Sequence, residues 1–135
     1  HTERVDFTLA WRRLADAAAG DEAPLRVLFT NADAPSAWLS RWRARCERAD
    51  GTTLDVKGSS LQRAERMRGI NPIVIPRNHR VEEALAAASR DADMGLFTQL
   101  LAAVQQPFVE MPERARYAEP APASVTACYR TFCGT

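Results

Sequence analysis

The feature that most constrains the fold of this chain is the helical spacing of its apolar residues between helix-breaking residues. The clearest case is an apolar set at positions i, i+3, i+4 and i+7, which comprises Phe97, Leu100, Leu101 and Val104. This spacing is typical of the buried face of an α-helix, and Pro107 ends the pattern. Similar segments recur along the chain, so the sequence predicts an all-α fold.

About five helices are predicted from these patterns and their caps. Four of them are expected over residues 6–19, 35–50, 59–69 and 78–90. The fifth follows a cap at Asp91 or Asp93 and ends at Pro107, so the last two helices form an antiparallel hairpin. Asp6 is expected to cap the first helix and Gly20 to end it, while Ser59 and Gln62 form a capping box for the third.

The predicted inward faces follow from the same spacing. Along the first four helices they comprise Phe7, Trp11, Leu14 and Ala18; Trp38, Leu39, Trp42 and Cys46; Leu61, Ala64 and Met67; and Val81, Leu85 and Ala88. The short apolar run over residues 25–29 fits either a helical turn or a strand. Residues 106–135 are rich in proline and are predicted to form an extended tail. The sequence therefore indicates one small helical domain over residues 1–135.

A stiff, polar joint is predicted between the third and fourth helices. Asn71 and Pro72 can begin a single turn, but Pro76 disfavours helical backbone at Ile75, so a short turn or an extended link is expected there. We interpret the joint as structural, and it comprises Asn71, Pro72, Pro76, Arg77, Asn78 and His79. Its polar side chains are expected to satisfy backbone groups at the corner, with Asn78 as a helix cap.

The same joint also contains residue types that perform chemistry. His79 and Glu83 are four residues apart and could form an acid–base pair, although a first-turn histidine that interacts with Glu83 is the alternative that we favour. Arg77 and Arg80 could clamp a phosphate or carboxylate, or they could tie a loop to neighbouring carbonyl groups. The carbonyl interpretation is the one that we favour.

Charge and composition limit the function classes. The net charge is +1, which gives no general reason to expect nucleic acid as a partner, although tryptophan and arginine alternate in WLSRWRARCER. No apolar run approaches the ~20 residues of a membrane span, so no membrane is expected. Cys46, Cys128 and Cys133 lack metal-ligand spacing, which favours reduced thiols in the cytoplasm. The chain begins at His1 rather than at a methionine, and we expect it to be part of a longer protein.

Five segments occur in an order that matches a known family: LAWRRL, AWLSRWRARC, NPIVIPRNHRVEEAL, FTQLLAAVQQPF and YRTFCGT. In these segments the chain resembles the C-terminal region of the selenoprotein O family, bacterial members included. That family comprises protein adenylyltransferases with a pseudokinase fold, which transfer AMP from ATP to Ser, Thr or Tyr hydroxyl groups of other proteins with Mg or Mn. The resemblance implies that the nucleotide site lies in a kinase-like N-terminal core outside this chain. We therefore assign no catalytic, cofactor-binding or metal-binding residue here.

The resemblance also implies a role for one thiol. The family has a cysteine or selenocysteine near the C-terminus that is linked to redox control through a disulfide to the kinase-like core, and Cys133 matches it. Cys128 is a possible alternative partner for Cys133. The leading hypothesis is thus an accessory, regulatory helical domain of an adenylyltransferase, whose partners are the kinase-like core and the protein substrates. The alternative is a stand-alone helical module that binds protein or nucleic acid.

Overall fold

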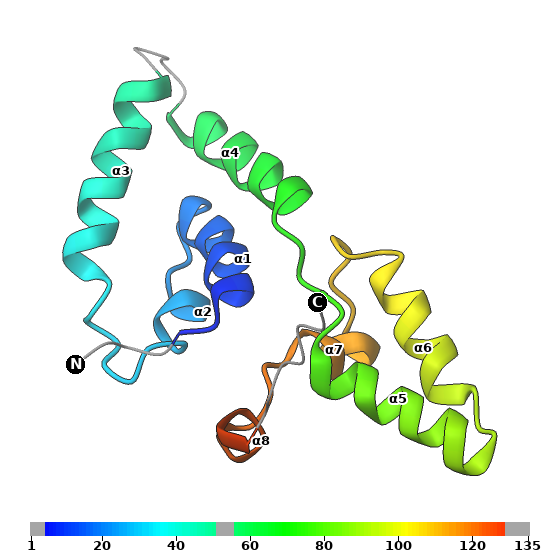
Figure 1. Cartoon of the computed structure of the whole chain (residues 1–135). Helices are drawn as coiled ribbons and strands as arrows, with labels where there is room; N and C mark the ends of the chain where they lie inside the picture. Colours follow the sequence, from blue (N-terminus) through cyan, green and yellow to red (C-terminus); the bar gives the residue numbers. More distant parts are fainter. Residues whose placement is uncertain (1–4, 51–55, 129–135) are drawn as a thin grey trace, which may run out of the picture. The chain divides into compact units, whose positions relative to one another are not determined.

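The computed structural model describes residues 5–50 and 56–128, and these residues are helical with no strand among them (Figure 1). The helices of ten or more residues are α1 (Phe7–Ala18), α3 (Ser36–Asp50), α4 (Val56–Ile70), α5 (Asn78–Asp91) and α6 (Gly95–Val104). The shorter ones are α2 (Ala23–Arg26), the 3-10 turn η1 (Pro112–Arg114), α7 (Ala115–Ala118) and α8 (Ala123–Cys128). The predicted all-α class is confirmed.

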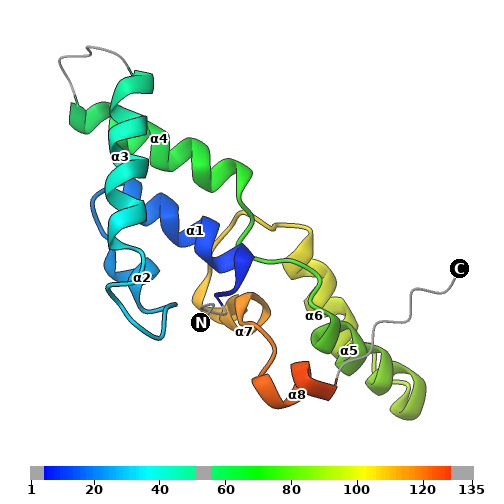
Figure 2. The same ribbon diagram turned by 60° about the vertical axis from the view of Figure 1, so that its left-hand side comes forward.

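The chain divides into two compact units, His1–Ile73 and Val74–Thr135, which we call the first and second units. Each unit has its own helix packing, and Figure 2 shows the helices of both from a second direction. The predicted single domain over residues 1–135 stays a prediction. Within the described residues, no helix combines the length and the apolar character that crossing a membrane requires.

Helix α1 begins and ends where the sequence predicts. The Asp6 carboxylate accepts a hydrogen bond from the Leu9 N–H at 2.9 Å, which satisfies one of the unpaired donors at the helix start. Gly20 has a φ of 105°, a left-handed value that glycine adopts at little cost. Both capping predictions for this helix are therefore confirmed.

The interior of the first unit is a small apolar cluster. Leu14 and Ala17 of α1, Leu25 of α2 and Leu39 of α3 are buried together, and Met67 of α4 packs against them. Helix α1 contacts both α2 and α4. The apolar run over residues 25–29 begins in the helical turn α2, so the helical alternative is the correct one. Its Leu25 is a full member of the cluster.

Three aromatic side chains that were predicted to face inward are instead exposed. Phe7 is 75% exposed, and Trp11 and Trp38 are each about two-fifths exposed. Helix α1 buries the face that carries Leu14, Ala15 and Ala17, which leaves Phe7 and Trp11 at the edge of the contact. The predicted inward position was wrong for these aromatic residues. Helical spacing shows which residues share an apolar face, but it does not show which edge of that face the neighbouring helices cover.

Helix α4 begins earlier than predicted. It starts at Val56, so Ser59 lies inside the helix and the predicted capping box is wrong. Gly58 lies inside α4 and not in the loop expected before Ser59, because a glycine inside a helix costs only about 1 kcal/mol and is tolerated here. Of the predicted inward residues, Ala64 is buried and Leu61 is 45% exposed.

Helices α5 and α6 pack against each other as the predicted hairpin. Ala84 of α5 and Leu100 and Ala103 of α6 are buried. Two of these three buried residues are small alanines, whereas the larger Leu85 and Leu101 are exposed. The hairpin is confirmed, whereas the predicted inward positions of Leu85, Phe97 and Leu101 are wrong.

The segment predicted as an extended tail contains helical turns in its described part. Pro112 begins η1, and the Pro122 carbonyl accepts hydrogen bonds from the Val125 and Thr126 N–H groups at 2.9 and 3.0 Å. A proline at a helix start loses no intrahelical hydrogen bond, because the first N–H groups have no partner in the helix. The prolines therefore start short helices instead of excluding them, and Tyr117 of α7 is buried.

Replacement of Ala92 with glycine should stabilise the second unit. Ala92 ends α5 with a φ of 52°, a left-handed conformation that disfavours residues with a Cβ atom. We expect Ala92→Gly to raise the free energy of unfolding by about 0.5–1 kcal/mol in chemical denaturation, whereas Ala86→Gly, inside the same helix, should lower it by a similar amount. An unchanged or lower stability of Ala92→Gly would contradict the assignment of strain to this residue.

Candidate functional site

The joint between α4 and α5 is an irregular link without helix. The Asn71 N–H still donates to the Met67 carbonyl at 2.8 Å, so Asn71 closes the last turn of α4. No helical turn forms at Pro72, and the backbone is irregular from there to Arg77. Neither predicted alternative, a short turn or an extended link, describes the whole joint, because the Arg77 N–H donates to the Ile75 carbonyl at 2.8 Å and closes a three-residue turn at Pro76. Ile73 and Val74 are buried within the joint.

Two arginines of the joint bind the end of helix α7. The Arg77 guanidinium donates to the Ala118 carbonyl at 2.8 Å, and Arg80 Nε donates to the Arg116 carbonyl at 3.2 Å. The last carbonyl groups of a helix have no partner within it, and a cation at that end interacts favourably with the helix dipole. The prediction that these arginines tie a loop to carbonyl groups is confirmed. This engagement disfavours a phosphate clamp at the same two residues.

Asn78 does not cap helix α5. The cap position belongs to Arg77, whose ψ of 130° is extended and whose side chain makes no capping hydrogen bond. The Arg77 carbonyl accepts the first helical hydrogen bonds, from the N–H groups of Arg80 and Val81. The predicted capping role of Asn78 is therefore wrong by one residue. The exposed Asn78 is the first residue of the helix itself.

The Glu83 carboxylate is held by two arginines. It accepts hydrogen bonds from Arg80 at 3.0 Å and from Arg116 at 2.9 Å. Burial raises the pKa of Glu83, but the hydrogen bonds and charges of Arg80 and Arg116 outweigh it, so the pKa lies below its ordinary value. Because these bonds occupy Glu83, it acts on His79 through its charge alone. The two residues do not form a hydrogen-bonded acid–base pair.

His79 lies in the first turn of α5, as the favoured interpretation predicts. Its Nε2 atom is buried and has no hydrogen-bond partner among the described residues. Burial and the nearby charges of Arg80 and Arg77 lower the pKa of His79, and the charges of Glu83 and Glu82 only partly oppose this. The site therefore holds a neutral imidazole beside two cations, which is unsuited to a general acid at neutral pH.

The lowered pKa of His79 predicts how stability depends on pH. Protonation is harder in the folded state than in the unfolded chain, whose pKa is about 6.5. The stability that His79 contributes is thus fully present above pH 6.5 and is lost as the pH falls below that value. We expect the unfolding midpoint to decrease between pH 7 and pH 5.5, and His79→Gln to remove part of that decrease. A decrease of equal size in the variant would contradict this account.

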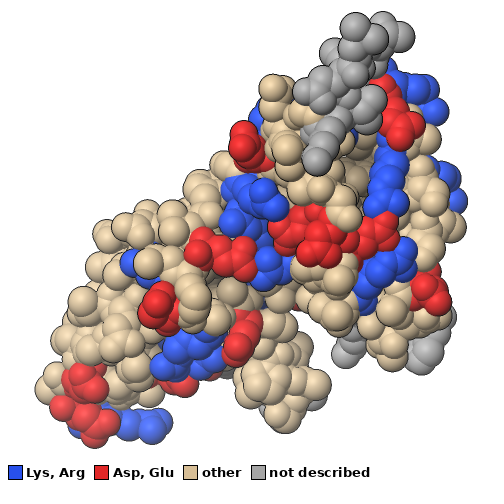
Figure 3. All heavy atoms as spheres, turned by 180° about the vertical axis from the view of Figure 1, so that it is seen from behind, with Lys and Arg blue, Asp and Glu red and all other residues tan. Residues whose placement is uncertain are grey.

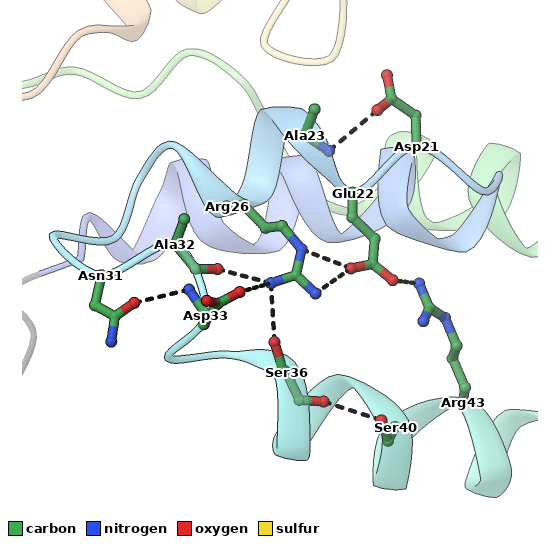
Figure 4. A network of polar contacts seen from close by, with 10 residues as sticks. All are labelled: Asp21, Glu22, Ala23, Arg26, Asn31, Ala32, Asp33, Ser36, Ser40 and Arg43. Atoms are coloured by element: carbon green, nitrogen blue, oxygen red, sulfur yellow. Dashed lines mark hydrogen bonds and ion pairs between the residues drawn. The ribbon is translucent and has the colours of Figure 1, made fainter.

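A second polar network lies in the first unit (Figure 4). Arg26 of α2 donates to the Glu22 carboxylate at 2.7 Å, to the Ala32 carbonyl at 2.7 Å and to the Ser36 hydroxyl at 2.9 Å. Glu22 also forms an ion pair with Arg43 of α3. These bonds fasten α2 and the following loop to the beginning of α3. This role of Arg26 was not predicted. The spacing of four residues between Glu22 and Arg26 is a local signal for their ion pair, whereas Ala32 and Ser36 reach Arg26 only through the path of the loop.

The charged side chains do not form a surface of one sign on the face seen in Figure 3. Blue Lys and Arg side chains lie next to red Asp and Glu side chains there. Ion pairs among the described residues include Arg13–Asp16, Arg26–Glu22, Arg43–Glu22, Arg68–Asp16, Arg80–Glu83 and Arg116–Glu83. Such pairing weakens the case for nucleic acid binding by these arginines, which depends on unpaired cations.

The two cysteines with a predicted redox role, Cys128 and Cys133, lie at or beyond the end of the described residues. Cys133 lies outside the described residues, and the described part of the chain ends at Cys128, whose side chain is also outside the description. Cys46 of α3 is a free, half-buried thiol. In the described residues, no group of three or more His, Cys, Asp or Glu side chains could hold a metal ion.

The sequence is related to protein nucleotidyltransferases. The relatives are proteins named protein nucleotidyltransferase YdiU, of the selenoprotein O family. The chain is 48% identical to the one from Cereibacter sphaeroides over 134 residues, 48% to the one from Chromobacterium violaceum over 131, and 44% to the one from Agrobacterium fabrum over 131. No protein-family model matches the chain.

The match covers nearly all of this chain and little of its relatives. It takes in 97–99% of the chain but only 25–26% of these three proteins, so the chain spans about a quarter of their length. The chain is therefore a homologue of one part of the YdiU protein nucleotidyltransferases. The resemblance to the selenoprotein O family is confirmed, and the coverage is consistent with a C-terminal region.

Proposed function

We propose that this chain is a non-catalytic, helical accessory domain of a protein adenylyltransferase. In this proposal the whole enzyme transfers AMP from ATP to Ser, Thr or Tyr hydroxyl groups of protein substrates with Mg or Mn. A kinase-like core outside this chain holds ATP and the metal. The chain packs on that core within the cytoplasm of a bacterium.

One observation carries the proposal: a match over 97–99% of the chain to a quarter of proteins named nucleotidyltransferases. The arrangement of the joint supports a structural role, because its arginines are used to hold helix α7 and the Glu83 carboxylate. Phosphoryl and nucleotidyl transfer require cations and metal-binding carboxylates that converge on the nucleotide. The arginines of the joint are occupied by carbonyl and carboxylate groups instead.

Transfer of labelled AMP tests the proposal. The full-length protein that carries this chain, incubated with ATP labelled at the α-phosphate and Mn, should label protein substrates or itself at hydroxyl groups. The chain alone, under the same conditions, should label nothing. Labelling by the isolated chain, or none by the full-length protein with either metal, would contradict the proposal.

We further propose that Cys133 regulates this transfer by forming a disulfide, with Cys128 or with a thiol of the core as partner. Oxidised glutathione would accept the two electrons and two protons that disulfide formation releases. Cys133→Ser should then remove the change in AMP transfer that oxidised glutathione causes, and Cys46→Ser should leave it in place. An equal response of the Cys133→Ser variant and the unmodified enzyme would refute this role.

A further inference from the structure

The first unit carries an apolar groove that its own side chains do not fill. The groove has a volume of about 370 Å³ and is lined almost entirely by apolar groups from α1, the α2 region and α3. Its lining includes Phe7, Trp11, Leu25, Phe29, Pro35 and Trp38. Phe7 at 75% exposure is among the most exposed apolar side chains of this unit. Apolar surface gathered in one place on a small domain indicates a binding surface.

A second groove continues along the outer face of α3. It has a volume of about 500 Å³, and its lining includes Trp38, Trp42, Arg41, Arg45 and Arg48. The rings of Trp38 and Trp42 are stacked, with centroids 6.2 Å apart. Because Trp38 lines both grooves, they form one surface. We call it the α1–α3 surface: it is apolar at Phe7 and Trp11 and cationic at Arg41, Arg45 and Arg48.

The cations of the α1–α3 surface are available to a partner. Arg43, on the opposite side of α3, is occupied by Glu22 (Figure 4). Arg41, Arg45 and Arg48 make no ion pair with any other residue that the structure describes. Three unpaired guanidinium groups next to two stacked indole rings attract carboxylate groups on a partner that also has apolar side chains.

We propose that the α1–α3 surface binds a segment of the remaining nucleotidyltransferase that is apolar at one end and acidic at the other. This inference rests on the proposed function, since the occupant belongs to the same enzyme. The relatives are about four times as long as this chain, so their matched part has a large protein surface beside it. The charge pattern of the α1–α3 surface determines the direction in which the segment lies.

Two other occupants fit this surface less well. A second copy of the chain would bring three more unpaired arginines to the interface, where like charges repel. A nucleic acid would pair its phosphates with the arginines and could stack bases on the aromatic rings, but it would leave the aliphatic lining of the groove, at Leu14, Leu25 and Pro35, without an apolar partner. Because the α1–α3 surface is apolar at one end and cationic at the other, it favours a protein segment with apolar and acidic side chains.

Matched pairs of variants test the surface in the full-length protein. Phe7→Asp is compared with Val27→Asp, since Val27 is equally exposed at 77% but lies outside both grooves. Arg45→Glu is compared with Arg66→Glu, an exposed position of α4 outside both grooves. We expect Phe7→Asp and Arg45→Glu to lower the melting temperature of the full-length protein by several degrees and to speed protease release of this segment at least five-fold. Val27→Asp and Arg66→Glu should do neither.

Melting of the isolated chain and AMP transfer by the full-length protein distinguish loss of the proposed contact from loss of folding and from failure of the proposed function. In the isolated chain all four variants should melt within a degree or two of the parent, because the changed side chains are exposed there. Equal effects of the test and control variants in the full-length protein would overturn the proposal. So would dimerisation of the isolated chain that Phe7→Asp abolishes, or binding to single-stranded DNA that Arg45→Glu abolishes. If the full-length protein transferred no AMP but the variants differed as expected, the proposed function would fail and the α1–α3 surface would stand.

Discussion

Replacement of Leu39 with alanine should lower the free energy of unfolding of the first unit by about 3 kcal/mol, within the range for buried leucines. Leu39 is 1% exposed and is the buried residue that α3 contributes to the cluster of Leu14, Ala17 and Leu25, against which the partly buried Trp42 of α3 also packs. The truncation removes buried methyl groups and leaves a cavity that this small cluster cannot close. Urea denaturation followed by tryptophan fluorescence measures the change.

The matched control for Leu39 is Leu61→Ala. Leu61 lies on α4 in the same unit but is 45% exposed, so its truncation should cost less than about 1 kcal/mol. A loss of similar size at both positions would show that the buried cluster is not what holds α3 in place.

Replacement of Arg12 with methionine should destabilise the same unit by about 2–3 kcal/mol. Arg12 is 5% exposed and donates to the Arg68 carbonyl at 2.9 Å and to the Asn71 carbonyl at 3.4 Å. These carbonyl groups belong to the end of α4, so the cation stabilises a helix C-terminus and ties α1 to α4. Methionine has a similar volume but cannot donate, which leaves the carbonyl groups without this partner.

The control for Arg12 is Arg66→Met at an exposed position of α4, where we expect a change within about 0.5 kcal/mol. If Arg12→Met were as stable as the parent chain, the cost of burying the guanidinium would equal the benefit of its hydrogen bonds. The anchoring role assigned to Arg12 would then be wrong.

Local signals in the sequence predict the helices well. Asp6 and Gly20 mark the ends of α1, because the conformations that they favour are set by their own chemistry and not by distant contacts. The α5–α6 hairpin follows from two apolar patterns joined by a short Asp-containing turn. The predicted cap of α6 at Asp91 or Asp93 was wrong, because the cap position belongs to Met94 and no side chain makes a capping hydrogen bond there. Asp93 lies one residue earlier and accepts a hydrogen bond from the Gly95 N–H at 2.8 Å.

Side-chain burial was much harder to predict. Phe7, Trp11 and Trp38 fit the helical spacing of an inward face, yet a small domain has too little interior to enclose them. Conversely, the pattern gives no reason to bury a charged residue such as Arg12, because its partners are carbonyl groups 56 and 59 residues away in the chain. Such contacts depend on the tertiary fold.

The joint shows the same division between local and distant effects. Pro76 predicts non-helical backbone at Ile75 from its own geometry, and the structure has no helix there. The partners of Arg77 and Arg80 lie on α7, a helix that was predicted as part of an extended tail. The residue types therefore predicted the kind of contact, but the helix that supplies the carbonyl groups could be found only in the structure.

A calorimetric titration with ATP and Mn tests the central claim that this chain supports a nucleotide site lying outside it. ATP is titrated separately into this chain and into the full-length Cereibacter sphaeroides relative, to which the chain is 48% identical. The account predicts a binding heat with the full-length relative and none with this chain. Micromolar binding of ATP to this chain would contradict it.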